Sequence, residues 1–169
     1  MIKDLVIYPD ARLREISKEI VEFDGVTEIL DNMYETMIEK GGVGLAGVQI
    51  GVLKRVLIAN PPREDKIQYK EDLLEIINPI VLEKEGEIIF QEGCLSIPGY
   101  FEEVSRFNFI KIKFLDRFGK EKILTAEGYL AVIIQHEIDH LNGALFIDKL
   151  SILKRKKFEK EYRANSKIN

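Results

Sequence analysis

Two histidines stand four residues apart in the segment 135–140 (QHEIDH). An α-helix turns by about 100° per residue, so positions i and i+4 leave the same face of the helix, one turn apart. Two imidazoles placed in this way can bind one metal ion. The alternative is a pair of core histidines that hydrogen-bond to carbonyl groups. We favour the metal, because burying four polar groups on an otherwise apolar helix is costly unless they serve a function.

Glu137 and Asp139 flank the two histidines on opposite sides of the predicted helix. Each lies about 80° from the centre of the histidine face, so neither is well placed as a third ligand, although either can reach a water molecule beside the ion. Helical geometry alone does not choose between them. Glutamate reaches further by one methylene group, so we favour Glu137 as the general base. We expect Asp139 to form an ion pair or to support a ligand.

A third ligand must be of another residue type, because the chain contains no further histidine. One candidate is Cys94, which we expect in a turn-rich loop, residues 92–99 (EGCLSIPG), just after a predicted strand. The other is Glu159 or Glu161, in a lysine-rich segment typical of a solvated helix. A lone cysteine is commonly an inert buried side chain, yet beside two histidines that lack a ligand we favour Cys94. One thiolate and two imidazoles leave a fourth position open, as in hydrolytic metal sites.

The chain has 169 residues, of which 46% are apolar and 32% are charged. This composition predicts a folded chain, and the length predicts one catalytic domain over 1–169, with 151–169 as an appended charged helix. A single cysteine excludes an intramolecular disulfide. The first residues resemble neither a signal peptide nor a transit peptide, and no apolar run approaches the ~20 residues that span a bilayer. We therefore expect a cytoplasmic protein without a membrane partner.

The net charge of −4 is unevenly distributed. Residues 154–169 carry a charge of +5, so the preceding 153 residues carry −9. One interpretation of the basic segment is a solvated helix that packs through Phe158 and Tyr162, and the other is docking on RNA. The acidic remainder argues against specific DNA binding. The basic side chains are those of Lys154, Arg155, Lys156, Lys157, Lys160, Arg163 and Lys167.

Hydrophobic periodicity predicts the elements that must position these residues. A helix is expected over 26–40, ended by two glycines. Residues 129–142 contain no proline or glycine and are apolar nearly all round, which is typical of a buried central helix. Ser151 can cap a last helix that runs to about 165. Strands are predicted at 54–60, 74–82, 86–91, 109–115 and 120–126, the last two as a hairpin. Strand pairs around one buried helix predict an α+β fold.

Three segments together resemble the peptide deformylase family: 42–49 (GVGLAGVQ), 92–96 (EGCLS) and 135–140 (QHEIDH). The resemblance covers essentially the whole chain. It implies an α+β fold of antiparallel or mixed β-sheets around a central buried metal-binding helix, with a C-terminal helix. It also implies a hydrolase that removes the formyl group from the N-terminal formyl-methionine of nascent polypeptides and releases formate.

The resemblance also implies roles for the residues of the motifs. By motif position, Cys94, His136 and His140 bind one divalent metal ion, and Glu137 is the general acid/base. The expected native metal is iron(II), because the family commonly uses it. Zinc, nickel and cobalt also suit one sulfur and two nitrogen ligands, so a purified sample can hold one of these ions instead.

Other motif residues are expected to contact the substrate. Gln49 and the backbone N–H of Leu95 resemble the groups that stabilise the oxyanion in the family, and Gly44 lies where its members contact the substrate backbone. Gly47 departs from the family pattern, which usually has alanine there. Glycine loosens a backbone, so we expect Gln49 to be held less firmly.

The methionine side chain needs an apolar pocket. Adjacency to the motifs and the resemblance together suggest five lining residues, although each can equally be ordinary core packing. They are Val43, Phe90, Tyr129, Val132 and Ile133.

Two other functions remain open. A zinc protease would use Glu159 or Glu161 as the third ligand in place of Cys94. A non-enzymatic module that binds the ribosome or RNA would hold its metal only for structure. The basic segment 154–169 also has a functional interpretation within the resemblance, since some members of the family dock on the ribosome through such a helix.

Overall fold

The computed structural model describes residues 1–168, and the side chains of residues 1–164. In the predicted basic segment 154–169, the side chains from residue 165 onward, including that of Lys167, lie outside the described part. The elements follow in the order α1 (Val26–Glu39), β1 (Gly44–Ala46), β2 (Val56–Ala59), β3 (Leu74–Glu85), β4 (Ile88–Cys94), β5 (Ile97–Arg106), β6 (Phe109–Leu115), β7 (Glu121–Glu127), α2 (Gly128–Leu141) and α3 (Ile152–Ile168). Short 3-10 turns lie at Ala11–Arg14, Gly47–Ile50, Lys70–Asp72 and Phe146–Lys149.

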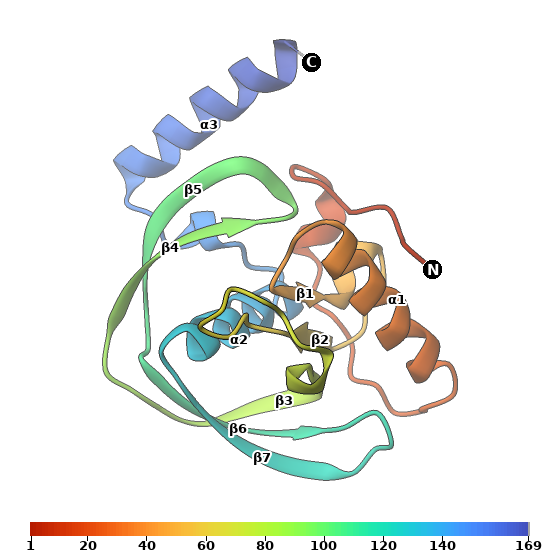
Figure 1. The fold of residues 1–169 in the computed structure, drawn as a ribbon. Helices are drawn as coiled ribbons and strands as arrows, with labels where there is room; N and C mark the ends of the chain where they lie inside the picture. Colours follow the sequence, from red (N-terminus) through yellow and green to blue (C-terminus); the bar gives the residue numbers. More distant parts are fainter. Residues whose placement is uncertain (169) are drawn as a thin grey trace.

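The strands form two antiparallel sheets around α2 (Figure 1). The larger sheet has the order β1-β2-β3-β6-β7, and β4 pairs with β5 in the smaller one. The predicted hairpin is confirmed, and Asp116 closes its turn by accepting hydrogen bonds from the N–H groups of Phe118 and Lys120. The α+β architecture with antiparallel sheets is thus confirmed.

Helix α2 is the buried central helix that its composition predicts. Ala131, Ile134 and Leu141 join an apolar cluster with residues of β1, β2 and β6. Gly143 ends the helix region in the left-handed conformation with φ +74°, which costs glycine little because it has no Cβ. The helix spans one residue earlier at each end than the predicted range, within the usual uncertainty of helix boundaries.

Strand β2 is buried along its whole length because it lies between two helices. Successive side chains of a strand point to opposite faces. Leu57 and Ala59 belong to the cluster around α2, whereas Val56 and Ile58 belong to a second cluster with the apolar face of α1. The sheet therefore holds α1 and α2 on opposite sides, which places β1 directly against the histidine helix.

Two strands were not predicted from periodicity, β1 and β5. The first part of β5 contains Pro98 and Gly99, which are typical of turns, but its pairing with β4 overrides that local preference. The expectation that Cys94 lies in a loop after a strand is wrong, because β4 runs through Cys94, which pairs with Ile97. The tight connection between β4 and β5 thus presents Cys94 from a strand end, which is a more rigid support than a loop.

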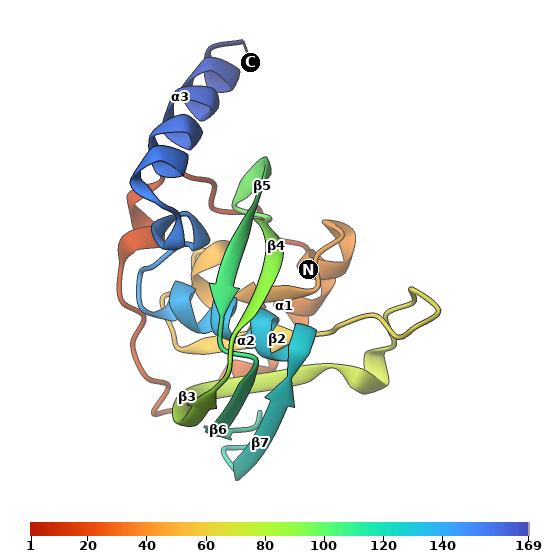
Figure 2. The ribbon, with the colours of Figure 1, turned by 90° about the vertical axis from the view of Figure 1, so that its left-hand side faces the viewer.

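The last helix, α3, extends away from the rest of the chain (Figures 1 and 2). Ser151 caps it as predicted, since its Oγ accepts a hydrogen bond from the Lys154 N–H at 3.3 Å. Phe158 is fully buried, and the hydroxyl of Tyr162 donates to the carbonyl of Tyr8 at 3.1 Å. Packing through Phe158 and Tyr162 is therefore confirmed. Among the described residues, no helix combines the length and the apolar character needed to cross a membrane.

Candidate active site

Cys94, His136 and His140 come together at the junction of β4 and α2. One potential ligand atom from each lies within 4.8 Å of the others. The Sγ of Cys94 is 3.4 Å from Nε2 of His140. One sulfur and two nitrogen donors that converge in this way fit a single divalent ion of the zinc or iron type. The structure thus brings together the three residues that the sequence predicted as ligands.

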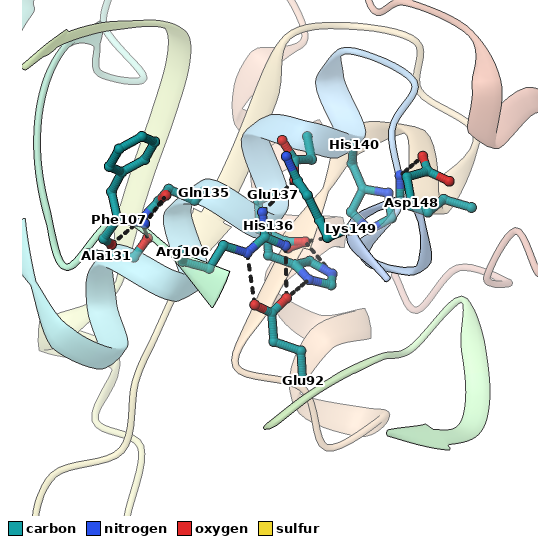
Figure 3. A network of polar contacts seen from close by, with 12 residues as sticks. Glu92, Arg106, Phe107, Ala131, Gln135, His136, Glu137, His140, Asp148 and Lys149 are labelled. Carbon is teal, nitrogen blue, oxygen red and sulfur yellow. Dashed lines mark hydrogen bonds and ion pairs between the residues drawn. The ribbon is translucent and has the colours of Figure 1, made fainter. Parts of the chain in front are cut away.

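A buried network of charged side chains contacts His136 at Nδ1, the ring nitrogen that faces Glu92 (Figure 3). This Nδ1 is 2.9 Å from Oε1 of Glu92. Arg106 donates two hydrogen bonds of 2.8 Å to the Glu92 carboxylate and one of 2.5 Å to Asp139. Burial alone would raise the pKa of Glu92, but the bonds from Arg106 and His136 hold it below its usual value. Such partners of a ligating histidine fix the direction of its ring.

The Asp139 side chain belongs to the same network of charges. Its carboxylate pairs with Arg106 and lies 3.9 Å from Nζ of Lys149, so the predicted ion pair is confirmed. The motif residue Glu92 had no predicted role, and Arg106 was not singled out at all. The only signal in the sequence was the need of a partly buried Asp139 for a cation, which does not say which of the 25 basic residues supplies it.

Glu137 lies on the side of α2 opposite Asp139 and faces the cluster of Cys94, His136 and His140. Its Oε1 lies 3.9 Å from Nε2 of His136 and 3.9 Å from Nε2 of His140. Burial raises the pKa of Glu137 to about 7. Burial also lowers the pKa of His140, with a further contribution from the charge of His136. Burial opposes the charged form of His136 too, but its bonds to Cys94 and Glu92 raise its pKa well above the usual value.

Gln49 lies in the 3-10 turn Gly47–Ile50 after β1, and its side chain reaches Cys94. Its Oε1 accepts a hydrogen bond from the Ala46 N–H at 2.9 Å, and its Nε2 lies 3.1 Å from Oγ of Ser96 and 3.6 Å from Sγ of Cys94. The backbone at Gly47 is closely packed, because a Cβ there would stand 2.8 Å from the carbonyl oxygen of Val52. The expectation that Gly47 leaves Gln49 loosely held is therefore wrong.

A cavity of about 420 Å³ opens in front of these groups. The rings of Phe90 and Tyr129 stack at 4.8 Å along it. Residues that sequence reasoning did not single out, among them Gly42, Pro98 and Phe101, also line this cavity. The predicted residues that line it are Val43, Gly44, Gln49, Phe90, Cys94, Leu95, Tyr129, Val132, Ile133, His136 and Glu137.

Residues 2–156 match the family model described as polypeptide deformylase. The chain belongs to the peptide deformylase family. A peptide deformylase of Helicobacter acinonychis (strain Sheeba) is 58% identical to it over 165 residues, 97% of this chain and 94% of the relative. The crystal structure of a peptide deformylase from Legionella pneumophila has 39% identity and a TM-score of 0.90, over 99% of this chain and 97% of that chain.

Another peptide deformylase structure, from Ehrlichia chaffeensis, contains actinonin. It has 39% identity and a TM-score of 0.88, over 97% of both chains. As a member of the peptide deformylase family, the chain is a metal-dependent hydrolase that removes the N-formyl group from nascent peptides. The family and the cluster of Cys94, His136 and His140 support one metal ion.

Membership of the peptide deformylase family decides between the functions left open above. The zinc protease with Glu159 or Glu161 as third ligand is not favoured, and both side chains pair with neighbours on α3 instead, with Arg155 at 3.4 Å and Lys157 at 3.9 Å. A non-enzymatic module with a structural metal does not hold, because the family consists of hydrolases.

Proposed function

We propose that Glu137 is the general acid/base of deformylation, that Gln49 and the Leu95 N–H stabilise the oxyanion, and that Cys94, His136 and His140 hold one iron(II) ion. The observation that carries this proposal is the position of the Glu137 carboxylate. It is 3.9 Å from both histidine Nε2 atoms, lines the cavity and is only 2% exposed. A carboxylate there can exchange a proton with a group in the cavity, whereas Asp139 is occupied by Arg106.

The proposed ligands would give the bound ion two imidazole nitrogens and one thiolate. When bound, the ion would supply Lewis acidity, which acidifies water and polarises a carbonyl group. Iron(II) is the proposed native ion, and zinc, nickel or cobalt suit the same donors in purified protein.

In the proposed reaction, Glu137 accepts a proton from the attacking water, whose oxygen forms a bond to the formyl carbon. The former carbonyl oxygen becomes negatively charged and receives hydrogen bonds from the Gln49 amide and the Leu95 N–H. Glu137 then donates the proton to the nitrogen. The carbon–nitrogen bond breaks and the free amine of methionine is released together with formic acid, which loses its remaining proton to solvent and becomes formate.

The apolar residues among the lining of the cavity support a site for the methionine side chain of the peptide. We assign the methionine side chain to an apolar pocket made by Val43, Phe90, Tyr129, Val132 and Ile133. Among the described residues, strand β1 is the edge strand of its sheet and has no strand beside it on the side away from β2. An extended peptide can pair its backbone with such an edge, which supports the role of Gly44 in binding the substrate backbone.

The test is the Glu137→Ala variant, assayed on a formyl-methionyl peptide in protein purified without oxygen. We expect formate release to fall by about 10²- to 10⁴-fold while metal analysis of the same sample finds the ion retained. Cys94→Ala should instead lose the metal. Glu127→Ala, an exposed glutamate just before α2, is the control and should match the unaltered chain. Full activity in Glu137→Ala would falsify the assignment.

Two further parts of the proposal concern the setting of the enzyme. We assign the reaction to the cytoplasm, where a nascent chain first presents its formylated end, and to one catalytic domain over 1–169 with 151–169 as its appended helix.

We also propose that the basic segment 154–169 docks on the ribosome. Lys156, Lys157 and Lys160 are exposed on α3, which supports contact with phosphates without loss of the packing at Phe158.

A further inference from the structure

We propose that Gln68 is a positioning residue for the substrate-binding edge Gly42–Gly44, which it holds from the loop between β2 and β3. The inference rests on the proposed function, because it assigns a support to the edge that binds the peptide. The loop projects beside the body of the protein in Figure 2, where it follows β2. The charged composition of residues 62–72 (PREDKIQYKED) predicts only a solvated loop there.

Gln68 joins two segments of backbone through one side-chain amide. Its Nε2 donates to the carbonyl of Gly42 at 3.0 Å and to the carbonyl of Asn60 at 2.8 Å. A side-chain amide nitrogen carries two hydrogens, so both are used on carbonyl groups. Asn60 directly follows β2, whereas Gly42 directly precedes the cavity-lining residues Val43 and Gly44. The side chain therefore ties the end of a buried strand to the edge of the cavity.

Contacts within the loop between β2 and β3 hold the backbone around Gln68 in place. The buried Asn60 donates from Nδ2 to the carbonyl of Tyr69 at 2.9 Å. Arg63 binds Asp72 through Nε at 2.7 Å, and its guanidinium carbon lies 4.1 Å from the centre of the Tyr69 ring. These contacts cross the loop on both sides of Gln68.

Gly42 also contacts Met37 and Leu95. Its N–H donates to the carbonyl of Met37 at 2.9 Å. A Cβ at this position would lie 2.6 Å from Cδ1 of Leu95, so the Leu95 side chain packs directly on Gly42. The next carbonyl, that of Val43, accepts from the Asn60 N–H at 2.7 Å. With the bond from Gln68, the consecutive carbonyls of Gly42 and Val43 each accept a hydrogen bond from the segment that follows β2.

This arrangement predicts a particular kinetic effect. The edge contacts the peptide backbone, which is held in the same way before the reaction and in the transition state. Weakening such uniform binding raises KM and leaves kcat nearly unchanged. Loss of a group that takes part in the chemistry would instead lower kcat.

The experiment compares three variants of the full chain in the metal-loaded form. Gln68→Met has a similar length but no donor, and we expect its KM for a formyl-methionyl peptide to rise about tenfold, the equivalent of roughly one hydrogen bond, with kcat within about twofold. Binding of the deformylated methionyl peptide, measured by calorimetry, should weaken by the same factor. Gln68→Lys, whose ammonium group can donate to both carbonyls, should recover most of the affinity. Glu64→Ala, an exposed residue of the same loop, is the control.

The inference is overturned if Gln68→Met keeps the KM and the product affinity of the unaltered chain. It is equally overturned if the loss lies in kcat, or if it follows a loss of metal or of folded protein at the assay temperature, because Gln68 would then be only a structural residue. If Glu137→Ala is fully active, the proposed acid/base fails instead, and the product-binding measurement still decides the role of Gln68.

Discussion

Single side chains in this site hold other side chains in place. Arg106 spans the two carboxylates of Glu92 and Asp139, and its own side chain is 3% exposed. A buried cation between two anions is stable only while all three remain. Because Glu92 also bonds to Nδ1 of His136, the direction of that imidazole depends on the complete network.

Replacement of Glu92 by glutamine tests this dependence. The amide keeps the volume but removes a charge from Arg106 and weakens the hold on His136. We expect the affinity for the metal to fall by about 10- to 100-fold, measured by competition with a chelator. Glu102, the cross-strand neighbour of Glu92, pairs with Lys154 at the surface instead, so Glu102→Gln is the matched control. Equal metal affinity in both variants would contradict the role of the network.

At the scale of elements, the short 3-10 turn Phe146–Lys149 joins the metal-bearing helix α2 to α3. The Asp148 side chain lies in this turn and binds three segments of the chain. Its carboxylate accepts hydrogen bonds from the Leu145 N–H at 2.9 Å, from Arg14 at 2.6 Å and from Arg155 at 2.9 Å. It thus links the turn to the first part of the chain and to α3.

Asp148→Asn should therefore destabilise the protein by about 1–2 kcal/mol at pH 7. Burial would raise the pKa of Asp148, but the bonds from Arg14 and Leu145 outweigh burial and lower it. The carboxylate thus stabilises the fold above its unfolded pKa of ~3.9, and this contribution disappears as the pH falls through the lower folded value.

Urea unfolding at several pH values between 7 and 3 measures this effect. The difference between the unaltered chain and Asp148→Asn should shrink below about pH 4. Asp24→Asn, at an exposed position, is the control and should show little difference at any pH. A difference for Asp148→Asn that stays constant down to pH 3 would contradict the role of the carboxylate.

Over the whole molecule, charge is separated along the chain. Residues 154–169 carry +5 and the rest of the chain −9. Phe158 is buried in a cluster with Leu13, Ile97 and Phe146, so deleting the segment would also remove part of the core. Charge replacement on its exposed side is therefore a cleaner test of the proposed docking than deletion.

Replacing Lys156, Lys157 and Lys160 by glutamate should weaken co-sedimentation with ribosomes by at least about tenfold and reduce its dependence on salt. Hydrolysis of a short formyl-peptide should stay the same, because none of the described side chains of α3 lines the cavity. Glutamates at the exposed positions Lys18, Lys40 and Lys54 provide a control with the same change of net charge. Co-sedimentation that is unchanged and insensitive to salt would exclude the docking.

Much of the fold followed from local patterns. The helix 26–40, the hairpin 109–126 and the central helix were predicted within one or two residues, because apolar spacing depends only on neighbours along the chain. Strand β5 was missed because Pro98 and Gly99 resemble a turn, and only its pairing with β4 makes it a strand.

The sequence by itself determined which cysteine and histidine side chains are available as metal ligands in this protein. It contains one cysteine and two histidines, and the two histidines lie on one face of a helix. Only the tertiary structure decided that Cys94 meets them, that Glu137 faces the cavity while Asp139 faces Arg106, and that Gln68 reaches Gly42. The spacing of His136 and His140 is fixed by the pitch of one helix. Contacts between distant segments depend instead on how two sheets pack around α2, which is the sum of many weak apolar contacts and has no local signature.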